Sequence, residues 1–216
     1  RVKKDKEIKD RIKERYGLPS KKRVGGKLIW FHASSIGESL SIIPLVNEIK
    51  KKKHISQILI TTGTKTSANL IDARISGKVI HQFLPLDVPS YVSSFLDYWR
   101  PSLAVFVESE VWPNLIIESK KRKIKQIIVN GRMTSQTFTK WMSYPNTAKK
   151  IFSCFEVCCT QNSDSLLFFQ KLGVNDCQFT GNLKFTSTPK KIDIKVKNEL
   201  KKKFSGKQLL VAASTH

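Results

Sequence analysis

Long apolar runs are absent from this sequence of 216 residues: no stretch reaches the roughly 18 apolar residues that a helix needs to span a bilayer. Cysteine is scarce as well. Its four residues show no paired C-x-x-C spacing, which excludes the usual zinc sites. The adjacent Cys158 and Cys159 suit a buried strand, so we expect reduced core thiols in a cytosolic domain.

Several catalytic and nucleotide-binding signatures are also missing. The sequence has no G-x-G-x-x-G, no Walker A glycine-lysine motif, no H-E-x-x-H and no G-x-S-x-G. These absences exclude the common dinucleotide fingerprint, the P-loop, the zinc-peptidase helix and the nucleophile elbow of serine hydrolases.

Acidic residues are few: 17 Asp and Glu stand against 39 Lys and Arg, for a formal net charge of +22. A field of this size attracts polyanions such as nucleic acid, acidic lipid headgroups or a phosphorylated substrate, although a lysine-rich proteome would give the same composition. The apolar residues within 1–16 lie about a helical turn apart, which predicts a basic amphipathic helix, either on a surface or simply solvated. The excess of positive charge is concentrated in residues 1–23, 50–53, 120–125, 149–150 and 190–203.

What the sequence does contain is 40% apolar residues, arranged as short apolar runs that alternate with helix-like segments. The runs lack a clean polar alternation, which is typical of parallel strands buried on both faces. The sequence therefore predicts an α/β fold with a doubly wound parallel sheet. We expect strands at residues 28–31, 57–61, 79–84, 103–107, 124–129, 155–159 and 176–180, and helices at 41–52, 67–72, 91–99, 113–122, 136–152 and 163–172.

The segment 28–39, LIWFHASSIGES, leads from a predicted strand through a polar turn into a helix. Open α/β sheets place ligands at such turns. The turn carries a carboxylate, Glu38, where a phosphate cradle would carry only glycines, so it favours proton chemistry or sugar binding. A helix capped at Ser41 would hold Pro44 in its first turn, whereas a start near Glu38 would place a kink at Pro44. Either start puts Glu38 near a positive helix end, so we expect its pKa to be lowered.

A second polar cluster is FVESEVWPN at residues 106–114. An extended backbone would point Glu108 and Glu110 to one face, where they could hold a divalent metal, orient a sugar hydroxyl or cap a helix. His32, at the end of the first predicted strand, could assist Glu38, although a satisfied core histidine is the more common case.

Two further clusters are VNGRMT at 129–134 and TGNLK at 180–184. Arg132 could bind a carboxylate or phosphate together with Asn130, or it could be an ordinary surface charge. The last cluster offers Asn182 and Lys184. Because parallel strands end at the same edge of a sheet, the four clusters together predict one shared site.

The order and spacing of HASSIGES, ESEVWPN, VNGRM and TGNLKF resemble those of the Kdo transferases of Gram-negative bacteria. These are GT-B glycosyltransferases of lipopolysaccharide synthesis, which move 3-deoxy-D-manno-octulosonic acid (Kdo) from CMP-Kdo to a lipid A precursor. The resemblance covers about residues 20–216. It implies a Rossmann-like domain that forms the N-terminal half of a GT-B enzyme.

The resemblance also implies a domain arrangement. Residues 1–26 would be a basic membrane-proximal lead-in, 27–190 the acceptor-binding domain, and 191–216 a linker with the first strand of the nucleotide-sugar domain. The family begins with an apolar anchor and ends with a complete second domain. We expect this chain to start after the anchor and to stop early in the second domain, and we expect it to turn over poorly or not at all by itself.

Residue roles follow from the resemblance at matching positions. It implies that Glu38 is the general base and that Glu108 and Glu110 belong to the catalytic set. One departure is Gly131, where the family typically has Ala, a change that we expect to be mild. The implied substrate-binding residues are Ser35, Gly37, Asn130, Arg132, Asn182 and Lys184.

The implied reaction is an inverting transfer in which Glu38 takes a proton from the acceptor hydroxyl, the hydroxyl attacks Kdo, and CMP leaves. Arg132 and Lys184 are the expected anion contacts, and the scheme needs no metal or other cofactor. The implied partners are CMP-Kdo, a lipid A precursor (lipid IVA) and the anionic inner membrane at its cytoplasmic face, and no nucleic acid.

Two alternatives to this function remain. The charge would suit a nucleic-acid-binding domain, although no helix-turn-helix, zinc or RNA-binding signature is present. The chain could also be a catalytically inert fragment that lies on a membrane surface. Strong DNA binding would favour the first, and lack of transfer from CMP-Kdo would favour the second.

Overall fold

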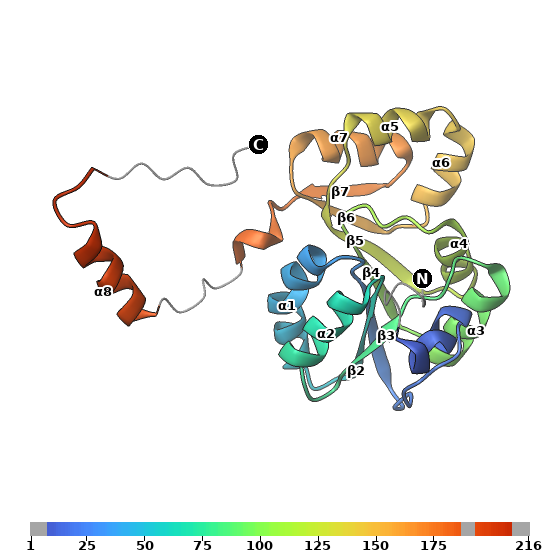
Figure 1. Ribbon diagram of the computed structural model, residues 1–216. Helices are drawn as coiled ribbons and strands as arrows, with labels where there is room; N and C mark the ends of the chain where they lie inside the picture. The colour runs from blue at the N-terminus through green and yellow to red at the C-terminus, as the bar shows by residue number, and fades with distance from the viewer. Residues whose placement is uncertain (1–7, 187–192, 209–216) are drawn as a thin grey trace. The chain divides into compact units, whose positions relative to one another are not determined.

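The computed structural model describes residues 8–186 and 193–208 (Figure 1). The chain divides into two compact units, Arg1–Thr186 and Ser187–His216, and each is described by itself.

The first unit is built on one seven-stranded parallel sheet in the order β3-β2-β1-β4-β5-β6-β7. The predicted doubly wound parallel sheet is therefore confirmed, and each predicted strand is present with its ends shifted by a few residues. The strands are β1 Lys27–His32, β2 Ile55–Thr62, β3 Val79–Phe83, β4 Leu103–Val107, β5 Lys125–Gly131, β6 Val157–Thr160 and β7 Asp176–Phe179.

Helices cover both faces of this sheet (Figure 1). One face is covered by α1 and α2, and the other by α3, α4, α6 and α7. The helices are α1 Ile36–Lys50, α2 Lys65–Arg74, α3 Pro89–Trp99, α4 Pro113–Lys121, α5 Ser135–Met142, α6 Pro145–Phe152 and α7 Ser163–Leu172, with short 3-10 helices η2 Lys9–Tyr16 and η3 Leu183–Thr186.

The central strand β1 shows why both faces are apolar. Leu28 and Trp30 are completely buried in the core on the α3 and α4 side. Phe31, which points the opposite way, is completely buried in the core beneath α1 and α2. Each such side chain contributes about 1.5–3 kcal/mol to folding by its burial. The continuous apolar run is thus the consequence of two cores.

The strand order reverses between β1 and β4. From β1 the chain winds outward through β2 to β3, then returns to β4 and winds the other way to β7. In such sheets the crevice at the carboxyl ends of the two central strands is where ligands bind. The turns that follow β1 and β4 carry Glu38, Glu108 and Glu110, so the fold brings the predicted acidic residues to this crevice.

Two helix predictions were wrong in detail. The first helix begins at Ile36, so of the two starts considered the one near Glu38 is right, and the bounds 41–52 with Pro44 in the first turn were wrong. The predicted helix 136–152 is two helices, α5 and α6. Proline lacks a backbone N–H, and Pro145 stands in the first turn of α6, where this costs nothing.

The basic lead-in is packed against the sheet over the residues that the structure describes. In η2, Glu14 is completely buried and Arg15 nearly so. The Glu14 carboxylate pairs with Arg11 at 2.8 Å and accepts a hydrogen bond from the backbone N–H of Phe83 at 2.6 Å. Neither a solvated helix nor a purely surface-lying one describes this segment; Val2 lies outside the described residues.

The second unit holds α8, Ile194–Lys203, capped by Asp193. This helix buries none of its side chains. The strand expected from Gln208 onward lies almost wholly outside the described residues. Within residues 8–186 and 193–208, no helix is both long and apolar enough to cross a membrane. The four cysteines carry free thiols.

Candidate functional site

The first turn of α1 fixes Glu38 at the carboxyl end of β1. Ser35 is the N-cap, and its hydroxyl accepts from the backbone N–H of Glu38 at 3.3 Å while donating to Glu38 Oε1 at 2.7 Å. The backbone N–H of Ser34 donates to Glu38 Oε2 at 2.8 Å. Ser35-x-x-Glu38 thus has the spacing of a capping box, with the N–H of Ser34 in place of that of Ser35, and this sequence signal gives the start of the helix correctly.

The pKa of Glu38 moves opposite to the expectation. Burial raises it, because the carboxylate is withdrawn from water, and the nearby charges of Glu110 and Glu108 raise it further. The hydrogen bonds from Ser35 and Ser34 act in the other direction but are outweighed. The prediction of a lowered pKa was therefore wrong, because desolvation exceeds the helix-end effect.

The turn after β4 is not extended, contrary to the prediction. Glu108 has a left-handed backbone (φ 59°), which is uncommon for a residue other than glycine. As a result Glu108 and Glu110 reach different partners instead of sharing one face. Glu108 Oε1 lies 3.1 Å from Lys184 Nζ and accepts a long hydrogen bond of 3.5 Å from Asn130 Nδ2.

Glu110 is held by two ring nitrogens. Its Oε2 accepts from Trp112 Nε1 at 3.0 Å and lies 3.4 Å from His32 Nε2. Burial acts to raise the pKa of Glu110, but hydrogen bonds from His32, Trp112 and Ser34 outweigh it and hold the pKa below its usual range. His32 therefore contacts Glu110 and not Glu38. Its Nδ1 lies 3.2 Å from the Thr61 carbonyl oxygen, on the opposite side of the ring.

Two neighbouring carboxyl groups with opposite pKa shifts are a recognised mark of acid–base sites. Glu38, with its pKa raised, takes up a proton more readily than an ordinary carboxylate. Glu110, with its pKa lowered, remains a fixed negative charge.

The fourth predicted cluster joins this site through backbone contacts. Asn130, also left-handed (φ 55°), accepts from the backbone N–H of Leu183 at 3.0 Å. Asn182 accepts from the N–H of Lys184 at 2.9 Å. A Cβ placed on Gly37 would lie 3.9 Å from Lys184 Nζ, so this ammonium lies beside the first turn of α1. The two asparagines thus position the segment that carries Lys184.

Arg132 is the predicted site residue that the structure does not bring in. Its side chain is exposed on the loop after β5, and no hydrogen bond or ion pair joins it to the other predicted site residues within the described chain. Asn114 also has a supporting role, because its side-chain amide donates to the Asp87 carbonyl at 2.7 Å. Asp87 accepts from the N–H of Leu115 at 2.9 Å and caps α4 from a neighbouring loop, for which no local sequence signal exists.

The metal option for Glu108 and Glu110 finds no support in this geometry. Within the described part of the chain, no group of three or more His, Cys, Asp or Glu side chains is arranged to hold a metal ion. The site is instead a set of carboxylates balanced by one lysine, one histidine and backbone N–H groups.

A family model described as "3-Deoxy-D-manno-octulosonic-acid transferase (kdotransferase)" matches residues 10–187. The chain belongs to this family. It is 33% identical to the 3-deoxy-D-manno-octulosonic acid transferase of Rickettsia felis, over 92% of this chain and 43% of that protein. The Haemophilus influenzae Kdo transferase is 28% identical over 96% of this chain and 50% of its own length. The chain thus spans about half the length of the curated relatives it matches.

Two solved structures resemble this chain in fold. A crystal structure of UDP-N-acetylglucosamine 2-epimerase matches with a TM-score of 0.55 at 13% identity, over 83% of this chain and 53% of that one. The Neisseria meningitidis UDP-GlcNAc 2-epimerase, bound to UDP-GlcNAc, matches with 0.53 at 12% identity, over 85% and 54%. At this identity the likeness concerns the fold alone, and it agrees with the predicted Rossmann-like half of a GT-B architecture.

Proposed function

We propose that this chain is the acceptor-binding half of an enzyme that transfers Kdo from CMP-Kdo to a lipid A precursor (lipid IVA) in lipopolysaccharide synthesis. Family membership supports the reaction class. The observation that carries the assignment to this half is the acidic cluster at the switch point of the sheet, where Glu38 combines burial with a raised pKa.

In the proposed mechanism Glu38 is the general base. A sugar hydroxyl is a weak nucleophile until its proton is removed. Each Glu38 oxygen already accepts one hydrogen bond, and a carboxylate oxygen can accept a second, so the acceptor hydroxyl can approach without displacing the cap. The hydroxyl oxygen bonds to the anomeric carbon of Kdo, the bond to CMP breaks, and the proton moves to Glu38. Attack opposite the leaving group inverts the configuration.

Glu108, Glu110 and Lys184 prepare this site. The two carboxylates raise the proton affinity of Glu38, and Glu108 holds the Lys184 ammonium beside Gly37. Lys184 is then available to meet an anionic group of the substrates, which carry a carboxylate and phosphates. Arg132 is exposed on the loop after β5, two residues from Asn130. We propose that it becomes a second anion contact only when substrate is bound.

The decisive experiment replaces the base in the full-length protein that carries this chain. Glu38→Gln keeps the capping-box geometry, because Gln serves in the same motif, but cannot accept the proton. We expect transfer from CMP-Kdo to lipid IVA, followed by thin-layer chromatography, to fall by about 10²–10⁴-fold. Glu48→Gln, an exposed residue of the same helix, is the matched control and should retain the wild-type rate. A Glu38→Gln enzyme with near-normal turnover would remove Glu38 from this role.

The proposal also carries the cellular setting that the family resemblance implies. The enzyme would work at the cytoplasmic face of the bacterial inner membrane, where a phosphorylated lipid acceptor is presented. Separation of membrane and soluble fractions of the native host, with detection of the full-length protein, tests this placement.

A further inference from the structure

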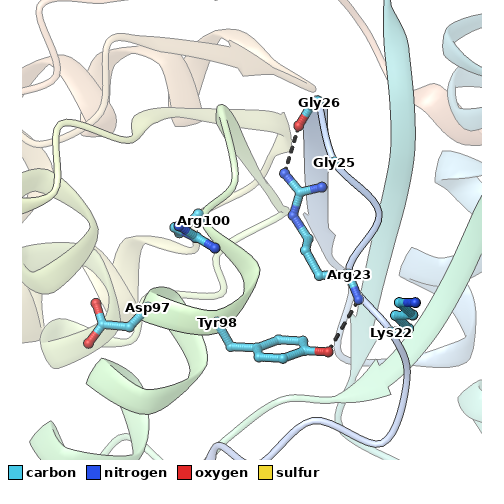
Figure 2. A pocket seen from close by; sticks show the side chains of 7 residues that line it. All are labelled: Lys22, Arg23, Gly25, Gly26, Asp97, Tyr98 and Arg100. Carbon is cyan, nitrogen blue, oxygen red and sulfur yellow. Dashed lines mark hydrogen bonds between the residues drawn. The ribbon is translucent and has the colours of Figure 1, made fainter.

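A hollow of about 640 Å³ opens at the amino end of β1, the edge of the sheet opposite to Glu38 (Figure 2). One wall is the segment that leads into β1, and the other is the end of α3. Its lining residues are Lys22, Arg23, Gly25, Gly26, Asp97, Tyr98 and Arg100.

Arg23 is locked into this wall. Its Nε donates to the Trp99 carbonyl at 2.7 Å. Its Nη2 donates to the Gly26 carbonyl at 2.7 Å, and its backbone N–H donates to Tyr98 Oη at 3.2 Å (Figure 2). The remaining nitrogen, Nη1, is buried without a hydrogen-bond partner among the described residues. The guanidinium is therefore fixed in place with its bonding incomplete.

The positive charge of the hollow is not balanced from within. Burial lowers the pKa of Arg23, and the neighbouring Arg100 lowers it further by repulsion. Arg100 is exposed, and its side chain has no hydrogen-bond or ion-pair partner in the described ranges. The one acidic residue of the lining, Asp97, is paired with Arg122 at 2.8 Å. A partly buried cation that lacks a counter-charge is costly, and a bound anion removes that cost.

Further positive charges lie at the same amino edge of the sheet as the hollow. The loops that lead into β2 and β5 lie at the amino edge of the parallel sheet, and they carry the lysines of residues 50–53 and 120–125. Clustered charges of one sign around a concave site raise the local concentration of anions.

We propose that this hollow binds the phosphate group of a phosphate ester, held by the exposed guanidinium of Arg100 with Lys22 at the rim and attracted by the fixed charge of Arg23 behind it. Guanidinium matches the tetrahedral phosphate better than other side chains do, because its planar fork donates two parallel hydrogen bonds. The ester is either free in solution or part of a lipid headgroup. The site is separate from the transfer site and does not depend on the function proposed above.

The test measures two probes against the 216-residue chain and its variants. Inorganic phosphate binding is followed by calorimetry, and vesicle binding by co-sedimentation with phosphatidylglycerol vesicles, with phosphatidylcholine vesicles as the uncharged reference. Arg100→Gln should weaken binding about tenfold, the worth of one charge-assisted hydrogen bond. Arg74→Gln, an exposed arginine that ends α2 outside the hollow, makes the same charge change and should leave binding close to wild type.

Each outcome decides. Loss of both probes in Arg100→Gln alone supports a general phosphate site, loss of phosphate alone supports a free ester, and loss of vesicles alone supports a lipid headgroup. Failure of wild type to bind either probe overturns the proposal, and so does an equal loss in Arg74→Gln. Lys22→Gln provides a second variant on the exposed rim, and it should reproduce the direction of the Arg100→Gln effect.

Discussion

Glu38 has two tasks that make opposite demands on its charge. As the capping-box residue of α1 it accepts hydrogen bonds from Ser34 and Ser35, which favour the ionised form. Its burial and the nearby Glu108 and Glu110 favour the protonated form and prevail. In the role proposed for Glu38, a raised proton affinity would make it the better base, and it would do so at the expense of fold stability.

This balance predicts a pH-dependent stability difference for Glu38→Gln. A raised pKa means that protonated Glu38 stabilises the folded chain fully below the unfolded pKa of about 4.3, and that this stabilisation is lost as the pH rises through the folded pKa. Gln keeps the cap and never ionises. We therefore expect the variant to gain stability over wild type as the pH rises from about 4 to neutrality. Urea denaturation at a series of pH values measures this, and a gain that grows toward acid pH would contradict it. The exposed control Glu48→Gln should show no such trend.

Gly131 is a second residue whose surroundings contradict an expectation, namely that exchanging Gly131 for Ala is a mild change. A Cβ built there would lie 2.9 Å from Cys158 Sγ and 3.2 Å from Phe169 Cε2, so an alanine, which the family typically has, is not a mild change in this chain. We expect Gly131→Ala to lower the free energy of unfolding by about 1–3 kcal/mol through overpacking.

A double mutant identifies the side chain that crowds a Cβ at position 131. Cys158→Ala removes the Sγ, so Gly131→Ala should cost much less in its presence, with a coupling of about 1 kcal/mol in urea denaturation. Additive losses would show that Phe169, and not Cys158, sets the limit at this position.

At the scale of elements, the lead-in helix η2 is connected to the turn that holds Glu38. Arg15 donates to the Leu84 carbonyl at 3.1 Å and to the Gly63 carbonyl at 2.8 Å. The N–H of Gly63 donates to the Ser34 carbonyl at 3.1 Å, and the N–H of Ser34 donates to Glu38. The basic segment η2, which its composition led us to expect on a surface, thus supports the turn that holds Glu38.

This connection predicts a positioning role for Arg15. Arg15→Lys keeps the charge but cannot hold both carbonyls in a fixed fork, so the turn at Ser34 should shift. In the full-length enzyme we expect kcat to fall about tenfold with little change in KM, and the midpoint of the pH–rate profile to move. Arg11→Lys disturbs the same helix without reaching Gly63 and should leave the pH profile unchanged. Equal profiles in the two variants would reduce Arg15 to a purely structural contact.

The elements also show what could be predicted from the sequence. The strands were found because a strand buried on both faces requires a continuous apolar run, as in Leu28–Phe31 and Leu103–Val107. The meeting of the polar clusters followed from the common edge of parallel strands. The left-handed turn at Glu108 was missed because no glycine marks it, and the burial of Glu14 was missed because its partner Phe83 lies far along the chain.

For the whole molecule, the net charge of +22 attracts any polyanion, but the sequence carries no helix-turn-helix, zinc or RNA-binding signature. The basic segments of the described residues belong to several elements: 50–53 to the end of α1 and the loop after it, 120–125 to the end of α4 through the start of β5, 149–150 to α6 and 195–203 to α8. Sequence-specific DNA recognition needs an element that enters a groove and presents side chains to base edges. Lysines at helix ends and in loops provide contacts to phosphate.

The chain should accordingly bind duplex DNA weakly and without sequence preference. Contacts to phosphate alone release counterions, so affinity falls steeply with salt, and non-specific complexes have Kd values of about 10⁻⁴–10⁻⁶ M at physiological salt. Fluorescence anisotropy with two unrelated duplexes of equal length should give equal affinities at each salt concentration. Binding of one duplex at about 10⁻⁸ M or tighter near 0.15 M salt, with the other duplex as control, would revive the nucleic-acid alternative. We expect the affinities for both duplexes to fall equally as the salt concentration rises, because the excess positive charge binds phosphates and not bases.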